Sequence, residues 1–203
     1  MKLNKKGKLL TLNDIDWNAY ITSFLDKHDI DNSIDSDSIK IDCDSLMLLT
    51  DYLDINKKKL DYNKILTMLD DLGSQLTYLE RNNYILSRIE LGDILVINKD
   101  IFLIVNTDCF SEIDSNNYTL DINSFDSLLF TSPEMRENKK LSIESSYYIL
   151  ACLLIYSLFN KNLSNMSDKD KLLNLEPIID TNLYFFLLRC LHNNMENRYF
   201  VFI

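Results

Sequence analysis

Apolar residues recur at helical spacing in two stretches of the 203-residue chain. Within residues 61–81 they step by four and three along one face of a predicted helix, at Ile65, Leu69, Leu72, Leu76 and Leu79. A shorter repeat that starts at Trp17 predicts a helix ending near His28, with Asn13 or Asp14 as its cap. The first half of the chain is therefore expected to hold one short and one long amphipathic helix.

The most apolar run of the chain covers residues 147–159. It is too short to cross a bilayer, because a membrane-spanning helix needs about 20 residues. We therefore predict a buried core helix and no membrane span. The turn Ser132-Pro133-Glu134 precedes this run, and a last apolar helix face is predicted over residues 183–192.

Short apolar runs predict strands in two regions. Residues 93–97 and 101–105 are β-branched and apolar, and a hairpin-like turn separates them. Earlier in the chain, residues 38–43 alternate like a strand, and residues 45–53 predict a second strand that leads into a connector. The acidic stretch 29–37 is predicted to be a loop, without the glycine and the closing glutamate of a calcium-binding loop.

Composition favours an α+β fold that is mostly helical. Three glycines and two prolines are few for a chain built on tight turns. The formal net charge of −10 argues against nucleic acid and anionic membranes as partners. The four cysteines are scattered without zinc-ligand spacing, which indicates buried thiols in an intracellular, reducing compartment. Heavy use of Asn, Ile, Lys and Asp suggests an AT-rich coding genome, such as that of a large DNA virus or a protist.

The order of predicted elements resembles the C-terminal lobe of eukaryotic-type protein kinases. The segment TYLERNNYILSRIELGDILVINKDIFLIVNTD, residues 77–108, is similar to the catalytic segment of that family. The resemblance places residues 86–88 at the family's His-Arg-Asp and residues 106–108 at its Asp-Phe-Gly turn. Asp93 falls at the asparagine of the catalytic loop, and the interval to the metal-binding turn matches the family pattern without a gap.

Two further motifs extend the resemblance toward the end of the chain. Residues 132–134 are similar to the family's Ala-Pro-Glu, and Arg198 falls at the position of a late arginine. The resemblance implies that Glu134 and Arg198 form a buried, bidentate ion pair. It also places Ser146 or Tyr147 where the family has an aspartate that braces the catalytic loop.

The residues that carry phosphoryl transfer in the family are largely replaced. Its His-Arg-Asp triplet is represented by Leu86, Ser87 and Arg88. A guanidinium cannot accept a proton, so Arg88 cannot act as a base, and Glu90 reverses the charge of the catalytic-loop lysine. Asp93 and Asn106 are an exchanged pair at the two metal positions. They are the candidates for a weak Mg²⁺ site, although we expect them to cap turns instead.

The phosphate-binding part of the family's N-terminal lobe is also missing. Only Gly7 precedes the first long helix, so the chain has no glycine-rich loop. Lys40 lies on a predicted strand without room for a helix before the next one, and Lys8 precedes a helix that contains no glutamate. We therefore expect no lysine–glutamate pair and no cofactor, with Mg-ATP as the alternative.

These observations predict one kinase-like domain over residues 1–203. Residues 1–53 would form a reduced N-terminal lobe, and residues 54–203 an intact C-terminal lobe. The predicted function is that of a pseudokinase, a catalytically inactive scaffold that binds a protein partner. Candidate anchors at the C-terminus are Tyr199, Phe200 and Phe202, which otherwise pack on the last helix.

Two alternatives remain open at this stage. One is a divergent Mg-ATP-dependent protein kinase that uses the exchanged Asp93 and Asn106. The other is a helical adaptor unrelated to kinases, which would have no hairpin over residues 93–105 and no contact between Glu134 and Arg198.

Overall fold

The computed structural model of the chain describes residues 11–12, 15–35, 38–113, 118–119, 128–164 and 166–201. Its helices are α1 (Trp17–Lys27), α2 (Leu49–Ile55), α3 (Tyr62–Arg81), α4 (Pro133–Asn138), α5 (Ile143–Phe159), α6 (Asp168–Leu175) and α7 (Asn182–Cys190). Its strands are β1 (Thr11–Leu12), β2 (Ile15–Asp16), β3 (Asn32–Asp35), β4 (Ser38–Ile41), β5 (Leu46–Leu48), β6 (Tyr84–Leu86), β7 (Ile94–Ile97), β8 (Ile101–Ile104), β9 (Phe110–Glu112), β10 (Tyr118–Thr119) and β11 (Lys140–Leu141). Short 3-10 turns occur at Leu91–Asp93, Thr107–Cys109, Glu176–Ile178 and Met195–Asn197.

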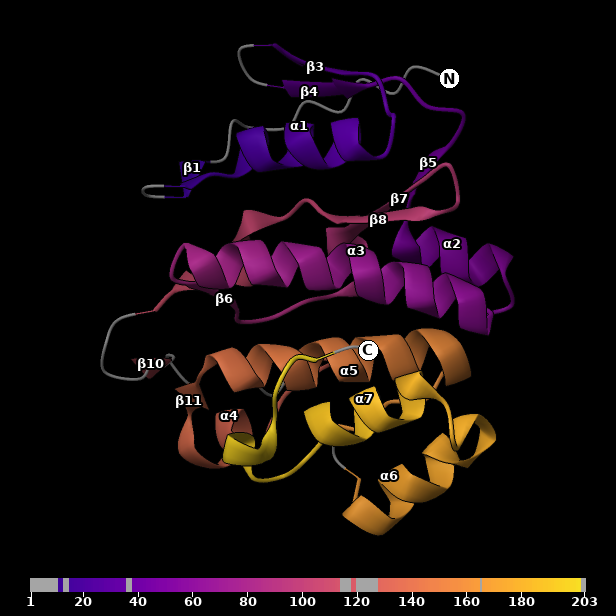
Figure 1. The fold of residues 1–203 in the computed structure, drawn as a ribbon, viewed down its shortest axis with the longest axis vertical. Coiled ribbons are helices and arrows are strands. Elements are labelled where there is room, and N and C mark those ends of the chain that lie inside the picture. Colours follow the sequence, from indigo (N-terminus) through magenta and orange to yellow (C-terminus); the bar gives the residue numbers. More distant parts are fainter. Residues whose placement is uncertain are drawn as a thin grey trace.

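The elements are stacked in layers along the long axis of the molecule (Figure 1). Helix α1 and the β3–β4 hairpin form one end, and a three-stranded sheet lies beneath them. Helices α3 and α5 cross the middle in succession, and α4, α6 and α7 form the other end. The fold is therefore α+β, as the sequence predicted, with most of its helices on one side of a small sheet.

The N-terminal part differs from the prediction in the acidic stretch 29–37. Helix α1 is present and ends next to His28, as the apolar spacing indicated. The acidic stretch 29–37 is not a loop throughout, because it contains strand β3, which pairs antiparallel with β4. The prediction missed β3 because its polar side chains hide the alternation that marks a strand. The candidate caps Asn13 and Asp14 fall outside the described residues.

The central sheet has the order β5-β7-β8, and both pairings are antiparallel. The predicted hairpin is present, and its turn uses left-handed backbone at Asn98 and Lys99, which suits a tight two-strand connection. The Asn98 side chain accepts hydrogen bonds from the backbone of Asp44 and Ser45, at 2.8 and 3.2 Å. The predicted strand over residues 45–53 was partly wrong, since only β5 is extended and helix α2 follows at once.

Helix α3 closes the outer edge of the sheet with two of its side chains. Asp61 begins the helix by accepting a hydrogen bond from the Lys64 backbone. Asp71 accepts a hydrogen bond from the Phe102 backbone N–H at 2.9 Å. Gln75 binds both ways, since it accepts from the Ile104 N–H at 2.8 Å and donates to the Phe102 carbonyl at 2.8 Å. The edge of β8 that would otherwise be unpaired is thereby satisfied by a helix.

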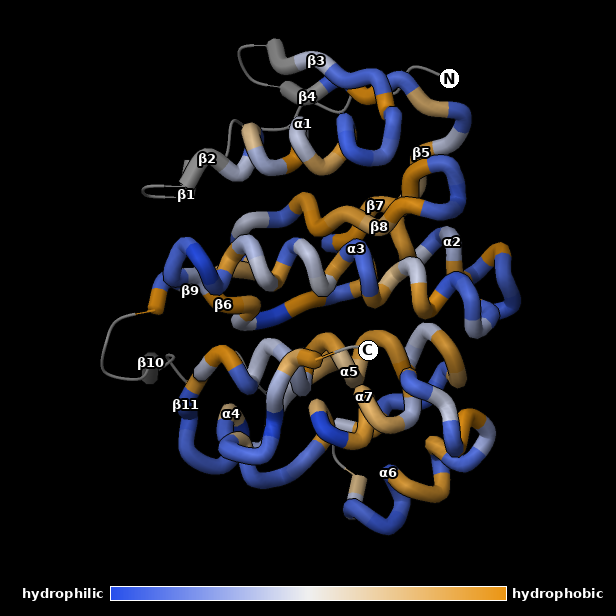
Figure 2. Tube along the Cα trace, in the orientation of Figure 1, coloured by the Kyte–Doolittle hydropathy of each residue, from blue (hydrophilic) through white to orange (hydrophobic). Residues whose placement is uncertain are grey.

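Helix α5 contains the apolar run and lies at the centre of the large helical layer. Ser142 caps it, and the Ser145 side chain accepts from the Ser142 backbone in return. Twelve of its seventeen residues are buried, and the helix packs against α3, α7 and β6. Figure 2 shows α5, β7 and β8 as the most continuously hydrophobic segments. Among the described residues, no helix has the length and apolar character required to cross a membrane.

The buried carboxylate of Asp71 also contacts helix α1. Its Oδ1 lies 3.2 Å from Nε2 of His28, but a ring N–H there is not aligned to donate. Burial raises the pKa of Asp71 to about 7, although the Phe102 N–H partly offsets this effect. Burial likewise lowers the pKa of His28. Both shifts favour the uncharged forms of the two side chains, so Asp71 is protonated in a substantial fraction of molecules near neutral pH.

We expect Asp71→Asn to change how stability depends on pH. An aspartate in an unfolded chain titrates near about 3.9, so the folded protein takes up a proton at Asp71 between about pH 4 and about pH 7. The contribution of Asp71 to the free energy of unfolding must fall as pH rises through this window. Asparagine keeps the acceptor for Phe102 but does not ionise. Urea unfolding at about pH 4 and about pH 8 should show that the free energy of unfolding of the variant increases relative to that of wild type as pH rises.

The matched control is Asp70→Asn, which changes the exposed neighbour on the same helix. It should leave the pH dependence close to that of wild type. If Asp71→Asn and Asp70→Asn have the same pH profile, Asp71 does not hold a proton in the folded protein.

Candidate functional site

The loop at the kinase-like catalytic position begins where β6 pairs with β9. Ser87 is fixed to the Cys109 carbonyl by its backbone N–H at 2.8 Å and by its hydroxyl at 3.0 Å. Ser146 of helix α5 accepts from the Leu86 N–H at 3.0 Å and donates to the Leu86 carbonyl at 3.2 Å. Of the two residues proposed to brace this loop, Ser146 is the one that makes the contact.

Arg88 is the residue that the sequence resemblance aligns with the family's catalytic base. Its Nε donates to the Asp108 carbonyl at 3.1 Å, and its guanidinium lies 4.0 Å from the Asp108 carboxylate. Both side chains are substantially exposed, so this pair is worth little to stability. The guanidinium remains a permanent cation, since arginine does not lose its proton in proteins. Glu90 is exposed beside it and contributes a backbone N–H to the loop.

The structure brings Asp93 and Asn106 together across the base of the hairpin. The Asn106 amide donates from Nδ2 to Oδ1 of Asp93 at 2.7 Å. Its Oδ1 accepts from the Asp108 backbone N–H at 3.1 Å. The second carboxylate oxygen of Asp93 accepts from the Glu90 N–H at 2.8 Å. Both residues therefore cap turns around the hairpin, and the two hydrogen bonds of Asn106 fix the orientation of its amide.

This arrangement does not fit a Mg²⁺ site. Magnesium takes oxygen ligands, and the amide turns its NH₂ toward the carboxylate while its oxygen is already used. Coordination would require the amide to turn over and give up two hydrogen bonds. Within the described ranges, no three His, Cys, Asp or Glu side chains gather in a way that could hold a metal ion. Burial, together with the nearby Asp93, raises the pKa of Cys109, which keeps that thiol neutral.

The N-terminal part was predicted to have neither a glycine-rich loop nor a lysine–glutamate pair for binding phosphates. Lys40 lies on β4, which pairs only with β3 among the described strands and does not join the β5-β7-β8 sheet. Helix α1 contains no glutamate. Lys8 and Gly7 fall outside the described residues.

Glu134 and Arg198, predicted to pair, form a bidentate ion pair. Arg198 Nη1 lies 2.7 Å from Oε1 and Nη2 lies 2.9 Å from Oε2 of Glu134. The remaining guanidinium hydrogens go to backbone carbonyls of His192, Asn193 and Glu144. The Tyr148 ring lies 4.8 Å from the guanidinium carbon. Every donor of the buried arginine is thus used, which is the condition for a stable buried charge.

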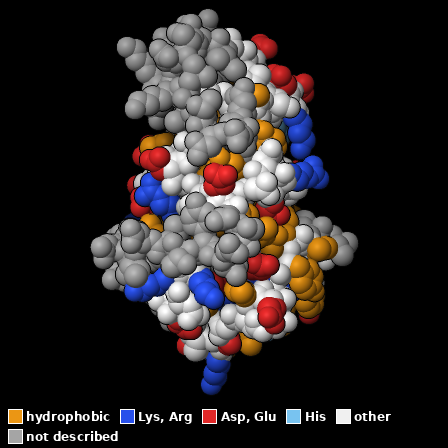
Figure 3. All heavy atoms as spheres, turned by 90° about the vertical axis from the view of Figure 1, so that its left-hand side faces the viewer, with side chains coloured by type: hydrophobic (Ala, Val, Ile, Leu, Met, Phe, Trp, Pro, Cys, Tyr) orange, Lys and Arg blue, Asp and Glu red, His pale blue; other side chains and the backbone are white. Residues whose placement is uncertain are grey.

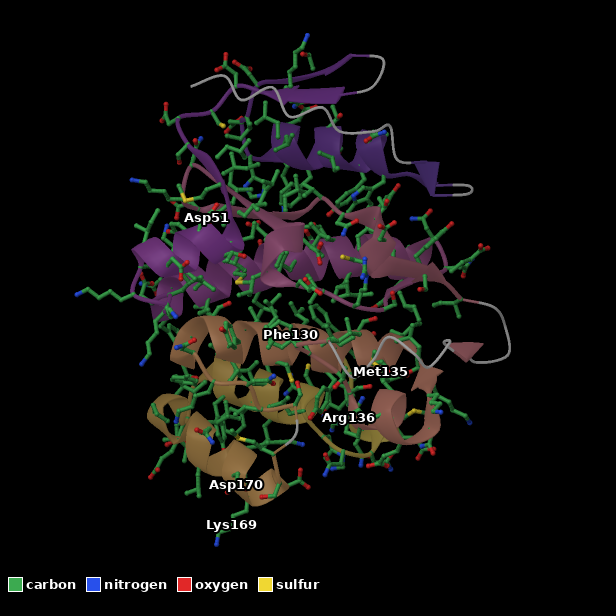
Figure 4. The ribbon with its side chains drawn as sticks, turned by 180° about the vertical axis from the view of Figure 1, so that it is seen from behind. Asp51, Phe130, Met135, Arg136, Lys169 and Asp170 are labelled. Carbon is green, nitrogen blue, oxygen red and sulfur yellow. The ribbon has the colours of Figure 1, made fainter. Side chains whose placement is uncertain are left out.

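Helix α4 and its flanks hold the carboxylate in position. Phe130 and Met135 are fully buried, and Phe130 contacts Tyr156 of helix α5 with ring centroids 5.7 Å apart. Seen from behind, both side chains lie beside α5, and Arg136 projects from α4 below them (Figure 4). Arg136 donates to the Ser164 carbonyl. These contacts fix α4, and with it Glu134, on the core.

The local environment favours the ionised form of Glu134. Burial alone would raise its pKa, but the hydrogen bonds from Arg198 and from the Ser145 hydroxyl, at 2.6 Å, outweigh this effect. The pKa of Glu134 is therefore lowered. Ser145 was not singled out from the sequence, although it is the third residue of helix α5 and forms the capping box with Ser142.

The fold, the braced loop and the buried ion pair define a kinase-like C-terminal lobe. Residues 45–201 match the family model of protein tyrosine and serine/threonine kinases. The chain belongs to this family. The alternative of an unrelated helical adaptor is therefore wrong, and the hairpin and the ion pair that it excluded are both present. A search of curated proteins found no match.

The C-terminal aromatic residues divide between core and surface. Phe200 packs against Tyr147 and Phe186, with ring centroids 5.4 and 5.3 Å apart. Tyr199 is 52% exposed, and the Arg189 guanidinium lies 5.0 Å from its ring centre. Phe202 falls outside the described residues. Of the two that the structure describes, Tyr199 is thus the more exposed.

Glu134→Gln is expected to lower the free energy of unfolding by about 3–5 kcal/mol, because it leaves the buried Arg198 charge without a counter-charge. The loss should shrink below about pH 4, since the lowered pKa of Glu134 means that its stabilisation disappears as the carboxylate protonates. Urea unfolding across this pH range measures both effects.

Glu137→Gln is the matched control, because Glu137 is exposed on the same helix. It should cost less than about 0.5 kcal/mol. Equal losses from the two substitutions would show that the ion pair does not hold the lobe together.

Asn106→Asp is expected to destabilise the hairpin by about 1–3 kcal/mol near neutral pH, because two carboxylates would then face each other at hydrogen-bond distance. The loss should be smaller at about pH 5, where the two can share a proton. Mg²⁺ at about 10 mM should recover part of it by bridging the oxygens. Thermal unfolding with and without the ion measures the change.

Asn63→Asp adds the same charge at an exposed position and serves as control. It should respond to neither pH nor Mg²⁺ in this way. If Asn106→Asp is as stable as wild type without the ion, the amide is not the donor that closes this site.

Proposed function

We propose that this kinase-family chain is a pseudokinase, which does not transfer phosphate and acts by binding a protein partner. The observation that carries the proposal is the hydrogen bond from Asn106 to Asp93, with Arg88 at the position of the base. The two metal positions are engaged with each other, and the base position holds a cation. The replacements affect the chemistry, while the scaffold contacts of Ser146, Glu134 and Arg198 are kept.

Each requirement of phosphoryl transfer supports this proposal in turn. The reaction needs metal ions on the phosphates, a lysine, and a carboxylate that orients the attacking hydroxyl. Arg88 would attract the phosphates but cannot take up the hydroxyl proton. Glu90, exposed beside it, would repel them.

The second candidate is a divergent Mg-ATP-dependent kinase. What favours it is the 2.7 Å contact itself, because a carboxylate and an amide side by side could both offer oxygen after a rotation of the Asn106 amide. The cost is two hydrogen bonds, each with a net value of about 1 kcal/mol. Bound Mg-ATP would have to supply that energy.

A protein is the expected partner, in an intracellular, reducing compartment. The four cysteines are buried free thiols, which fits such a compartment. Among the described residues on the face in Figure 3, Lys and Arg side chains lie scattered among Asp and Glu and do not gather into a basic patch of the kind that binds nucleic acid. Exposed apolar side chains on α7 and the C-terminal segment offer contact area, at Phe185, Leu188, Tyr199 and Val201.

Thermal unfolding with Mg-ATP tests the proposal. A ligand that binds only the folded state must raise the melting temperature once its concentration exceeds Kd. We expect no shift up to millimolar Mg-ATP and no transfer of labelled phosphate to a general substrate. Asp93→Asn is the control, because it keeps the shape of the side chain and removes the charge.

A shift in wild type that disappears in Asp93→Asn, together with phosphate transfer, would establish the kinase alternative. A shift that persists in Asp93→Asn would indicate nucleotide binding that does not use this residue. In that case phosphate transfer decides between an active and an inactive protein.

A further inference from the structure

Helices α1 and α3 enclose an open groove of about 580 Å³, a volume typical of ligand sites. It is lined by Tyr20, Ser23, Phe24, Lys27, Ser74, Thr77, Tyr78 and Arg81. The hairpin and the loop around Arg88 contribute no residue to this lining. The groove is therefore distinct from the kinase-like site.

The floor of the groove is a rigid aromatic surface. Tyr20 stacks on Tyr78 with ring centroids 4.2 Å apart, and on Trp17 at 4.8 Å. The Tyr20 hydroxyl lies 3.4 Å from the Ser74 hydroxyl. Burial raises the pKa of Tyr20 to about 12, so the floor stays uncharged. Such a surface can take an apolar side chain without first having to become ordered.

The only charged residues of this lining are two cations, Lys27 and Arg81. This is unusual in a chain with a net charge of −10. Both are exposed, and neither side chain makes a hydrogen bond or ion pair with the described part of the chain. Asp70 and Asp71 lie near the Lys27 end but do not line the groove.

The two cations lie at opposite ends of the groove because α1 and α3 run antiparallel. Trp17 lies near Tyr78, whereas His28, next to Lys27, lies near Asp71. Ten positions of α3 separate Asp71 from Arg81, which is about 15 Å at 1.5 Å per residue. An extended peptide covers that distance in about four or five residues.

We propose that this groove binds an acidic segment of a partner protein, with an apolar side chain between two carboxylates. The apolar side chain lies on Tyr20 and Tyr78, and the carboxylates pair with Lys27 and Arg81. The groove is open to solvent, and Ser23, Lys27 and Arg81 in its lining are exposed, which suits an extended chain better than an enclosed small molecule. The proposal rests on the proposed function only in that the chain acts by binding; it does not require a catalytically dead site.

The negative net charge of the chain does not oppose this binding at physiological salt. The Debye length is then about 8 Å, so distant carboxylates are screened while charges in direct contact are not. Local cations therefore select the acidic segment, and the aromatic floor supplies the contact area. Affinity should fall as salt concentration rises.

The test compares wild type with the double variant Lys27→Glu/Arg81→Glu. The matched control is Lys59→Glu/Lys169→Glu, which produces the same net charge at two exposed sites outside the groove. Lys169 lies at the far end of the molecule, on α6 (Figure 4). A third variant, Ser23→Trp, fills the groove from the exposed side of α1 and keeps both cations. Circular dichroism shows that each variant is folded.

A random dodecapeptide phage library is selected in parallel on the full-length wild type and on the double variant. Peptides enriched on wild type alone are labelled with fluorescein, and their Kd is measured by anisotropy. We expect them to carry two acidic residues around an aromatic or aliphatic one. The double variant should weaken binding about tenfold or more, and the control less than about twofold. Ser23→Trp should weaken it comparably to the double variant.

Three results would overturn the proposal: no peptide enriched on wild type alone, enriched peptides that lack acidic residues, or equal weakening by the control. Asp93→Asn should leave peptide binding unchanged. A catalytically active chain that still binds these peptides would refute the proposed function but not the groove. An inactive chain on which no peptide is enriched over the double variant would refute the groove proposal but not the proposed function.

Discussion

The buried ion pair between Glu134 and Arg198 is the constraint on which the C-terminal half of the structure depends. It joins helix α4 to a segment more than sixty residues later, through two direct hydrogen bonds and three more to backbone carbonyls. A buried charge is tolerated only when its partner and all its hydrogen bonds are in place. The pair therefore requires that α4, the start of α5 and the C-terminal turn adopt one relative position. Ser145 adds the cap of α5 to the same network.

At the two positions that the resemblance assigns to metal binding, the side chains hydrogen-bond to each other within an intact kinase-family fold. The Asn106 amide nitrogen donates a hydrogen bond to the Asp93 carboxylate. A second carboxylate in place of the amide would repel Asp93, and a bound cation would reduce that repulsion. The loop in front of them is still braced by Ser146 from the core helix. The contacts that brace the loop are thus present, while the residues aligned with the catalytic positions differ from those of the family. This combination is what supports an inactive but well-folded member of the kinase family.

Much of this architecture could be predicted from the sequence, because apolar periodicity reports directly on burial. Helices α1, α3 and α5, the β7–β8 hairpin and the pairing of Glu134 with Arg198 were reached from spacing and family resemblance. Strand β3 was not, since its polar residues carry no alternation, and β5 was extended too far into α2. The groove could not be found from the sequence either, because it depends on how two helices approach. The polar contacts between helix α3 and β8 did have a signal in the sequence. Asp71 and Gln75 are polar residues four positions apart, which places them on the same face of the long helix.

The contact of α3 with strand β8 has a geometric consequence. Asp71 and Gln75 are four residues apart, a rise of about 6 Å along a helix, and Phe102 and Ile104 are two residues apart, about 6.6 Å along a strand. The two spacings are nearly equal over this interval, so two side chains of the helix can hydrogen-bond to two successive outward-facing backbone N–H groups of β8, as a neighbouring strand would. Over a longer interval the periods would drift apart. A single inserted residue in either element would move one side chain off its rung, which makes this short joint sensitive to length in a way that ordinary apolar packing is not.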